Sequence, residues 1–255
     1  MTKASPLAPM STPARPELTG GRRVGVLLSH GFTGSPASIR PWAEHLAAQG
    51  YAVEMPLLPG HGTTWQDCNR TTFDDWHGAV VRYFELLRST CDAVVVAGLS
   101  MGGAQVLRLA ADRPDEVAGV VVVNPFVVSR RKDFLALPVM KWAVPSFPGI
   151  INDINKPGED EHGYSKVPLR ALHSLVRAGR RLADDLPEVT SPLLAFHSTE
   201  DHVVDDASIQ LIMARVSSRD LEEVALPNSY HVATLDHDAP KILEASTAFI
   251  ERVTS

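Results

Sequence analysis

Cysteine is scarce in this sequence of 255 residues, which contains only Cys68 and Cys91. Two thiols exclude a disulfide-rich scaffold. A structural zinc site takes about four ligands, and no paired Cys/His spacing supplies them. A chain of this length can bury a core large enough to be stable without such links. We therefore expect a globular protein that uses neither disulfides nor a metal.

Basic residues are also in the minority, with 24 Lys and Arg against 30 Asp and Glu and a net charge of −6. Without a dense basic stripe, we expect no nucleic-acid partner. No apolar run approaches the ~20 residues that a membrane-spanning helix needs. Residues 1–21 lack the apolar segment of a signal peptide and are predicted to be a flexible tail. These absences predict a cytoplasmic protein, and peripheral contact with a membrane would need only an apolar surface patch.

Short apolar runs alternate with amphipathic stretches along the chain. Five runs suit strands buried on both faces and occupy residues 24–29, 52–55, 93–97, 119–124 and 193–197. A sixth predicted strand, at 222–226, alternates charged and apolar residues. Helical spacing predicts helices at 38–50, 72–87, 101–113, 169–186, 206–216 and 240–253. Ser38 is expected to cap the first helix, and Thr72 with Asp75 the second. This alternation predicts an α/β fold with a mostly parallel, doubly wound sheet.

One long segment interrupts the alternation. More than forty residues between the run at 119–124 and the helix near 169 show no strand pattern but are rich in Pro, Gly and large apolar residues. A loop of this length is uncommon unless it is functional. We predict that residues 126–168 form a cap inserted after the sixth strand. The core would then consist of residues 22–125 and 169–255.

Residues 98–102 read Gly-Leu-Ser-Met-Gly and follow a buried strand. A helix pattern starts directly after Ser100, which gives the strand–turn–helix context of a nucleophile elbow. The tight turn leaves no room for side chains two residues on either side of the serine. The pattern predicts that Ser100 is a catalytic nucleophile.

Residues 30–34, His-Gly-Phe-Thr-Gly, follow the first buried strand. This is where such folds place a loop that donates one amide to an oxyanion hole, and the residue after the nucleophile donates the other. We therefore predict that the backbone amides of Phe32 and Met101 stabilise the negative oxygen of a tetrahedral intermediate.

Four carboxylates compete for the role of catalytic acid after the run at 193–197: Glu200, Asp201, Asp205 and Asp206. The acid should lie just beyond the strand end, which favours Asp201. Asp205 or Asp206 better suits the cap of the next helix.

The catalytic base should lie between the last strand and the last helix, where His231 stands. His237 is the rival, but a histidine flanked by aspartates suits the surface, and His202 is adjacent to the acid and would point elsewhere. The predicted triad is therefore Ser100, Asp201 and His231, in which the imidazole removes the serine proton.

Taken together, these motifs resemble the α/β-hydrolase superfamily over residues 24–253. More narrowly, the sequence is similar to bacterial monoacylglycerol lipases and related carboxylesterases. The matching stretches are HGFTG at 30–34, GHGT at 60–63, RTTFDDW at 70–76, GLSMGG at 98–103, EDHVV at 200–204 and NSYHVATLD at 228–236. The resemblance supports Asp201 and His231 over their rivals. It implies hydrolysis of monoacylglycerols, small lipid esters, without a metal or organic cofactor.

The resemblance also extends to two cap residues. It implies that Glu161 accepts hydrogen bonds from the glycerol hydroxyls and that Ile150 forms an apolar wall beside the substrate. The alternative for Glu161 is a solvated acid within the run 159–161. The first half of the cap departs from the family pattern, notably at residues 130–132, Arg-Arg-Lys. A carboxylesterase for short acyl esters is therefore the alternative function, and no oligomeric state is predicted.

Overall fold

The computed structural model describes residues 5–255. Within them the strands form a seven-stranded sheet in the order β1-β3-β2-β4-β5-β8-β9. Only β1 runs antiparallel to its neighbour, so the predicted mostly parallel sheet is confirmed. Its strands are β1 (Met10–Thr12), β2 (Val24–Ser29), β3 (Ala52–Met55), β4 (Ala93–Leu99), β5 (Gly119–Val123), β8 (Leu193–Ser198) and β9 (Leu221–Leu226).

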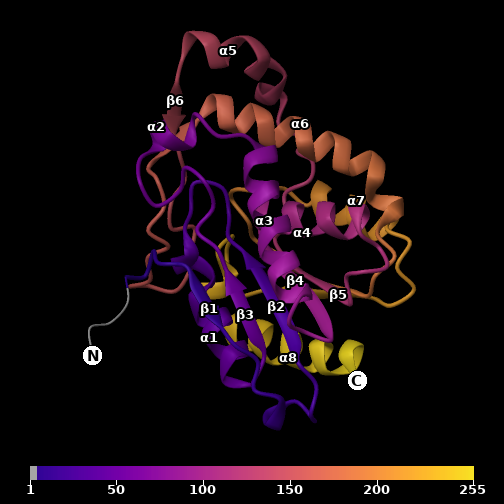
Figure 1. The fold of residues 1–255 in the computed structure, drawn as a ribbon. Helices are drawn as coiled ribbons and strands as arrows, with labels where there is room; N and C mark the ends of the chain where they lie inside the picture. Colours follow the sequence, from indigo (N-terminus) through magenta and orange to yellow (C-terminus); the bar gives the residue numbers. More distant parts are fainter. Residues whose placement is uncertain (1–4) are drawn as a thin grey trace.

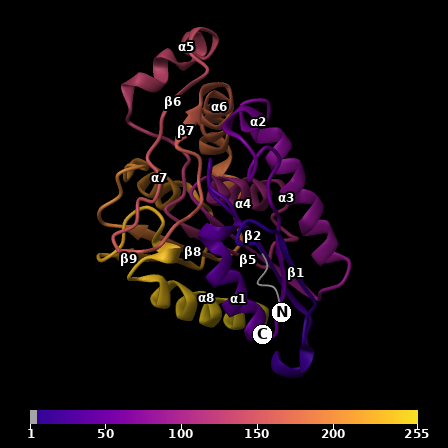
Figure 2. The ribbon, with the colours of Figure 1, turned by 90° about the vertical axis from the view of Figure 1, so that its left-hand side faces the viewer.

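Helices cover both faces of the sheet, which confirms the doubly wound prediction (Figure 1). The helices of the described chain are α1 (Arg40–Ala48), α2 (Trp65–Cys68), α3 (Phe73–Arg88), α4 (Met101–Asp112), α5 (Leu137–Ala143), α6 (Leu169–Asp185), α7 (Ala207–Arg215) and α8 (Ala239–Thr254). Figure 2 shows α1 and α8 on one side of the sheet and α3 and α4 on the other.

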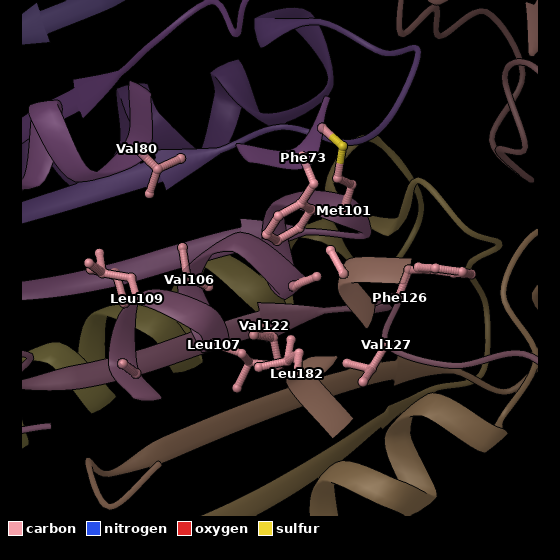
Figure 3. Close-up of a cluster of buried hydrophobic side chains, with 14 of the residues drawn as sticks. Phe73, Val80, Met101, Val106, Leu107, Leu109, Val122, Phe126, Val127 and Leu182 are labelled. Carbon is pink, nitrogen blue, oxygen red and sulfur yellow. The ribbon is translucent and has the colours of Figure 1, made fainter. Parts of the chain in front are cut away.

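The core is divided into two layers by the sheet. Because side chains alternate along a strand, Val94 and Val96 of β4 pack toward α3 and α4, whereas Val95 and Ala97 pack toward α1 and α8. All four side chains are at most 1% exposed. Figure 3 shows part of the first layer, where Leu107 of α4 and Leu182 of α6 lie beside Val122 of β5. Burial on both faces explains why the strands appear as continuous apolar runs.

The prediction of a flexible tail over residues 1–21 is wrong for part of that segment. Residues 10–12 form β1, which pairs with β3 in the register Met10 to Met55. Ser11 Oγ also donates a hydrogen bond of 2.6 Å to the carboxylate of Glu54, a buried residue. The reason is that β3 would otherwise present an unpaired edge, and the added strand satisfies its backbone groups. Residues 1–4 of the predicted tail lie outside the described residues.

The expected helix starts are confirmed at one position and wrong at another. Thr72 and Asp75 form a reciprocal capping box at the start of α3. Ser38, in contrast, does not cap α1, because a 3₁₀ turn (Pro36–Ile39) precedes that helix. Ser35 caps this turn by accepting a hydrogen bond from the Ala37 amide at 3.2 Å.

The segment between β5 and α6 forms a separate layer above the carboxyl ends of the strands. It contains a 3₁₀ turn (Lys132–Ala136), α5 and a hairpin of β6 (Ser146–Pro148) and β7 (Lys166–Pro168). It follows the fifth strand in chain order and not the sixth, because only β1 and four of the predicted runs precede it. In Figure 1, α5 lies at the top of the view, packed against α6. We call residues 126–168 the cap.

Tyr164 fastens the cap to the core. Its amide donates to the Thr33 carbonyl at 2.9 Å, and its hydroxyl donates to the Gly60 carbonyl at 3.0 Å and accepts from the Thr63 amide at 2.9 Å.

None of the helices within residues 5–255 combines the length and the apolar character that crossing a membrane requires.

Candidate active site

Ser100 lies on the sharp turn between β4 and α4, with φ 55° and ψ −116°. This positive φ is strained for a residue with a side chain. A Cβ atom on Gly98 would lie 2.3 Å from the Gly102 carbonyl carbon, and one on Gly102 would lie 1.9 Å from the Ser29 carbonyl oxygen. The two glycines of the motif are therefore steric requirements of the elbow.

His231 and Asp201 meet at the carboxyl ends of β8 and β9. The His231 Nδ1 atom lies 2.8 Å from Asp201 Oδ2, and both side chains are less than 10% exposed. The other carboxylate oxygen accepts hydrogen bonds of 2.8 Å from the amides of Val203 and Val204. Asp201 is therefore held in place and leaves Nε2 of His231 as the ring nitrogen that can accept a proton.

The electrostatics of the pair favour its charged form. Burial by itself would lower the pKa of His231, but the charge and hydrogen bond of Asp201 outweigh it, with further help from Glu161 and Asp153, so the pKa is raised. Burial opposes ionisation of Asp201 in the same way, but His231 and the two loop amides lower its pKa below the ordinary value. Stabilisation of the imidazolium is what a general base needs after it takes a proton.

The rival histidines have different surroundings. The ring of His202 lies 2.7 Å from a carboxylate oxygen of Asp153 and 3.3 Å from one of Glu200. His237 is exposed. Neither lines the cavity that contains Ser100 and His231.

The rival carboxylates are engaged elsewhere. Asp205 accepts hydrogen bonds from Ser129 Oγ at 2.7 Å and from the Ala207 amide at 3.1 Å, at the start of α7. Asp206 pairs with the Arg130 guanidinium at 2.5 Å. Both serve the junction of α7 with the cap, in keeping with the structural role that the sequence suggested for one of them.

The loop at residues 30–34 lies against the nucleophile. A Cβ atom on Gly31 would be 3.5 Å from Ser100 Cβ, so the following residue, Phe32, begins beside the serine. His30 fixes the loop, since its Nδ1 lies 2.9 Å from the Gly31 carbonyl and its Nε2 accepts from the Leu58 amide at 3.2 Å. Burial and the neighbouring His61 lower the pKa of His30 to about 3, so it is a neutral structural group.

Met101 is the first residue of α4 and is fully buried. An amide at this position has no carbonyl partner within its own helix, and the helix dipole adds positive potential there. The geometry therefore places an amide donor directly after Ser100, on the opposite side of the elbow from β4.

A cavity of about 340 Å³ opens over Ser100 between the core and the cap. Its polar members include Ser100, His231, Asp153 and Glu161. Of the seven site residues proposed from the sequence, five line this one cavity, namely Ser100, Phe32, Ile150, Glu161 and His231. The wall is mostly apolar and includes Phe32, Leu99, Phe126, Phe134, Leu137, Met140, Phe147, Ile150, Leu172 and Leu175.

Glu161 is partly buried at this cavity. Its Oε1 accepts a hydrogen bond of 2.9 Å from the Asn152 amide, and its Oε2 lies 3.4 Å from the position of a Cβ on Gly34. Burial raises its pKa, partly offset by the Asn152 amide and by His231. The carboxylate is therefore set in the cavity wall and is not a solvated surface acid.

Sequence reasoning missed Asn124, which organises the histidine loop. Its Nδ2 donates to the His231 carbonyl at 2.7 Å and to Ser198 Oγ at 3.0 Å, while its Oδ1 accepts from the Ser198 amide at 2.7 Å. Ser198 Oγ in turn donates to the Tyr230 carbonyl at 2.8 Å. The available signal in the sequence was an asparagine at the end of the apolar run 119–124.

Residues 5–255 contain no group of three His, Cys, Asp or Glu side chains arranged to hold a metal ion.

Comparison with known proteins agrees with this geometry. The family model described as serine aminopeptidase, S33, matches residues 21–238. A thermostable monoacylglycerol lipase of Bacillus sp. (strain H-257) is 40% identical over 96% of this chain and 97% of its own length. A carboxylesterase of Bacillus subtilis (strain 168) is 26% identical over 95% of this chain and 98% of its own.

A solved structure from work on LipS and LipT, two metagenome-derived lipolytic enzymes, superposes with a TM-score of 0.91 at 39% identity and covers 96% of this chain and 98% of that chain. The family match extends over the six strands of the sheet that follow β1, the elbow, the cap and the loops that carry Asp201 and His231. The chain belongs to the serine aminopeptidase S33 family of α/β-hydrolases.

Proposed function

We propose that this protein is a serine hydrolase that cleaves monoacylglycerols to fatty acid and glycerol through an acyl-enzyme. The observation that carries the proposal is the cavity that joins Ser100 and His231 to a long apolar wall and to the carboxylate of Glu161. A single acyl chain fits the apolar wall, and the polar end suits a small polyol. The 40% identical relative named as a monoacylglycerol lipase supports the same substrate.

The chemistry follows from the geometry of the three groups. Nε2 of His231 takes the proton of Ser100 Oγ, which attacks the ester carbonyl. The amides of Phe32 and Met101 donate to the oxygen that becomes negative; losing one such donor typically costs ~3 kcal/mol of barrier. His231 then protonates the departing glycerol oxygen. In the second step His231 takes a proton from water, which attacks the acyl-enzyme, and the proton returns to Ser100 as the fatty acid leaves. Asp201 stabilises the imidazolium in both steps.

Glu161 and Ile150 are proposed to define the substrate from the cap side. The carboxylate has acceptor sites left after its bond to the Asn152 amide, so it can accept hydrogen bonds from two glycerol hydroxyls. Ile150 lines the same cavity as Glu161 and provides an apolar wall beside the substrate. Because the cap covers the cavity, we expect slower release of a bulky diacylglycerol than of glycerol.

A carboxylesterase for short acyl esters is the second candidate, and the 26% identical carboxylesterase supports it. The two candidates share Ser100, Asp201 and His231 and differ only in how the cavity is used.

The deciding experiment measures fatty-acid release from monoacylglycerols of increasing chain length beside matched ethyl esters and a triacylglycerol. Ser100→Ala is the control for chemistry and should abolish all turnover. Preference for medium or long monoacylglycerols supports the lipase, whereas equal or faster turnover of short ethyl esters supports the carboxylesterase. A Ser100→Ala protein as active as wild type would refute both.

Glu161→Gln provides a second comparison, with Glu159→Gln as its matched control. Glu159 is an acid of the same run that pairs with Lys156 at 2.7 Å and does not line the cavity. Loss of a charge-assisted hydrogen bond should raise KM for monoacylglycerol about tenfold in Glu161→Gln and leave KM for ethyl esters unchanged. Equal effects of the two substitutions would contradict a glycerol-binding role.

We also propose that the outer face of the cap rests on an anionic lipid surface. Leu135, Val139 and Trp142 are each more than 70% exposed on and beside α5, which is unusual for large apolar side chains so close together. Lys141 and Arg170 lie against the Trp142 ring at 5.5 and 4.9 Å. Apolar side chains flanked by cations suit the boundary of an anionic membrane.

Sedimentation with phosphatidylcholine vesicles, with and without phosphatidylglycerol, tests this contact. Val139→Asp should reduce binding, and added phosphatidylglycerol should strengthen binding in a salt-sensitive manner. Leu86→Asp is the matched control, because Leu86 is an exposed apolar residue of α3 at 49% exposure, away from the cap. Equal binding by wild type and Val139→Asp would contradict the proposal.

A further inference from the structure

Asp153 is a buried acid of the cap that the triad chemistry does not use. It is 8% exposed and lines the same cavity as Ser100. Its Oδ1 accepts a hydrogen bond of 2.7 Å from the His202 ring, and its Oδ2 accepts from the backbone amides of His202 at 3.2 Å and His231 at 3.1 Å. Its own carbonyl accepts from the Val232 amide at 3.0 Å. One cap residue therefore binds the backbones of two separate loops.

These two loops carry the two partners of Ser100. His202 directly follows Asp201, and His231 lies beyond the next strand, β9. Asn124 holds the His231 carbonyl from the core side at 2.7 Å, while Asp153 holds the His231 amide from the cap side. The peptide groups on both sides of the His231 Cα atom are thus fixed by buried side chains, which restricts the position of the ring.

Asp153 also faces His231 electrostatically. The negative groups with the largest effect on the His231 ring are Asp201, Glu161 and Asp153, and each favours the imidazolium. Asp153 in turn faces the His202 ring, which also lies 3.3 Å from Glu200. The hydrogen bond to Asp153, together with its charge, raises the pKa of His202 above its ordinary value.

We propose that Asp153 is a positioning residue for ester hydrolysis, by which the cap holds the acid loop and the histidine loop in the geometry that the triad needs. The inference rests on the proposed function, because it assigns no chemistry of its own to Asp153. It makes the cap part of the catalytic machinery as well as a cover, since displacement of residue 153 would release the His231 backbone.

Asp236 provides a matched comparison. Its buried carboxylate also joins the cap to the histidine loop, accepting from the amides of Asn155 at 2.6 Å, Lys156 at 2.9 Å and Tyr230 at 2.9 Å. The charges with the largest effect on the pKa of His231 include Asp153 but not Asp236. Removing the charge of Asp236 therefore costs a similar set of structural hydrogen bonds with a smaller electrostatic effect on the base.

The test compares Asp153→Asn with Asp236→Asn on p-nitrophenyl butyrate, a soluble ester that does not depend on glycerol binding. For Asp153→Asn we expect kcat to fall about 10–100-fold with little change in KM, the size expected when a catalytic group is displaced by up to 1 Å. The acid limb of the kcat/KM profile should move to lower pH, because His231 loses one of its negative neighbours. Asp236→Asn should leave the acid limb in place. Thermal unfolding reports the structural cost of each.

Two results would overturn the inference. One is wild-type kcat with an unmoved acid limb in Asp153→Asn. The other is an equal fall in kcat and thermal stability in both variants with no change in either pH profile, which would mean a merely structural role. If Asp153→Asn does not fold, His202→Gln tests the same anchor from the exposed side, with a kcat at least about threefold lower expected and wild-type kcat contradicting it.

The assay also separates this inference from the proposed function. Wild type that hydrolyses p-nitrophenyl butyrate but not monoacylglycerol would refute the substrate assignment and leave the Asp153 measurement valid.

Discussion

Replacing Gly102 with alanine is the sharpest test of how the elbow is built. The added Cβ would lie 1.9 Å from the Ser29 carbonyl oxygen, 2.5 Å from its carbon and 2.9 Å from the His30 carbonyl oxygen. These are backbone atoms of β2 and of the loop that leads to Phe32, so no flexible side chain can give way. Restoring an ordinary contact of about 3.4 Å requires the start of α4 and the loop to separate by about 1.5 Å.

The separation acts on the site directly, because Met101 belongs to the start of α4 and Phe32 belongs to the loop. Moving the two segments apart therefore moves the two amides apart. A shift of about 1 Å can cost 10²-fold in rate, and removal of one oxyanion donor costs ~10²–10³-fold. We therefore expect kcat for p-nitrophenyl butyrate to fall at least about 100-fold. Overpacking of this kind also costs about 1–3 kcal/mol of stability, which thermal unfolding should detect.

Gly78→Ala is the matched control. Gly78 lies in α3, where an added Cβ would meet nothing within 4 Å, and its φ is not positive. Alanine is favoured over glycine in a helix by roughly 0.5–1 kcal/mol, so this variant should be slightly more stable and fully active. A Gly102→Ala protein with wild-type kcat and unfolding temperature would refute the steric account of the elbow.

Individual contacts of the structure lead to three more predictions. The pKa of His231 is raised above its ordinary 6.5, and the base must be neutral, so kcat/KM should fall as the pH drops through a value above 6.5; an acid limb centred well below that value would contradict the assignment. Asn124→Ala removes the donor to the His231 carbonyl and should lower kcat about tenfold or more with KM nearly unchanged, as steady-state kinetics would show. Thr72→Ala removes the cap of α3 and should cost about 1 kcal/mol in denaturant unfolding without a change in kcat, whereas an unchanged midpoint would mean that the capping box contributes nothing.

Local patterns were sufficient for much of this molecule. The elbow at Ser100 depends on a strand, a turn and a helix that are contiguous in the chain, so its residues identify it without any long-range contact. Five of the strands were recognisable as continuous apolar runs because they are buried on both faces, whereas the edge strand β9 is largely exposed and shows an alternating pattern. Thr72 and Asp75 satisfy each other three residues apart, and such reciprocal caps are local by nature.

One error occurred where a distant partner decides the structure, and the other where a neighbouring turn does. Residues 10–12 have no strand pattern of their own and become β1 because the edge of β3, some forty residues away, offers unpaired backbone groups. Ser38 has the chemistry of a cap, but Pro36 and Ser35 start a 3₁₀ turn before it, which moves the start of α1.

The sequence by itself determined the order of six strands of the sheet and of the six longest helices, the candidate nucleophile and the short list of candidate acids and bases, because these depend on hydrophobic periodicity and on turns within a few residues. Only the tertiary structure decided that Asp201 and His231 meet, and that Asn124 and Asp153 hold the His231 backbone from two sides. Those contacts join residues 30 to 107 positions apart. They exist because parallel strands bring their carboxyl ends to one edge of the sheet, where the cap closes over them.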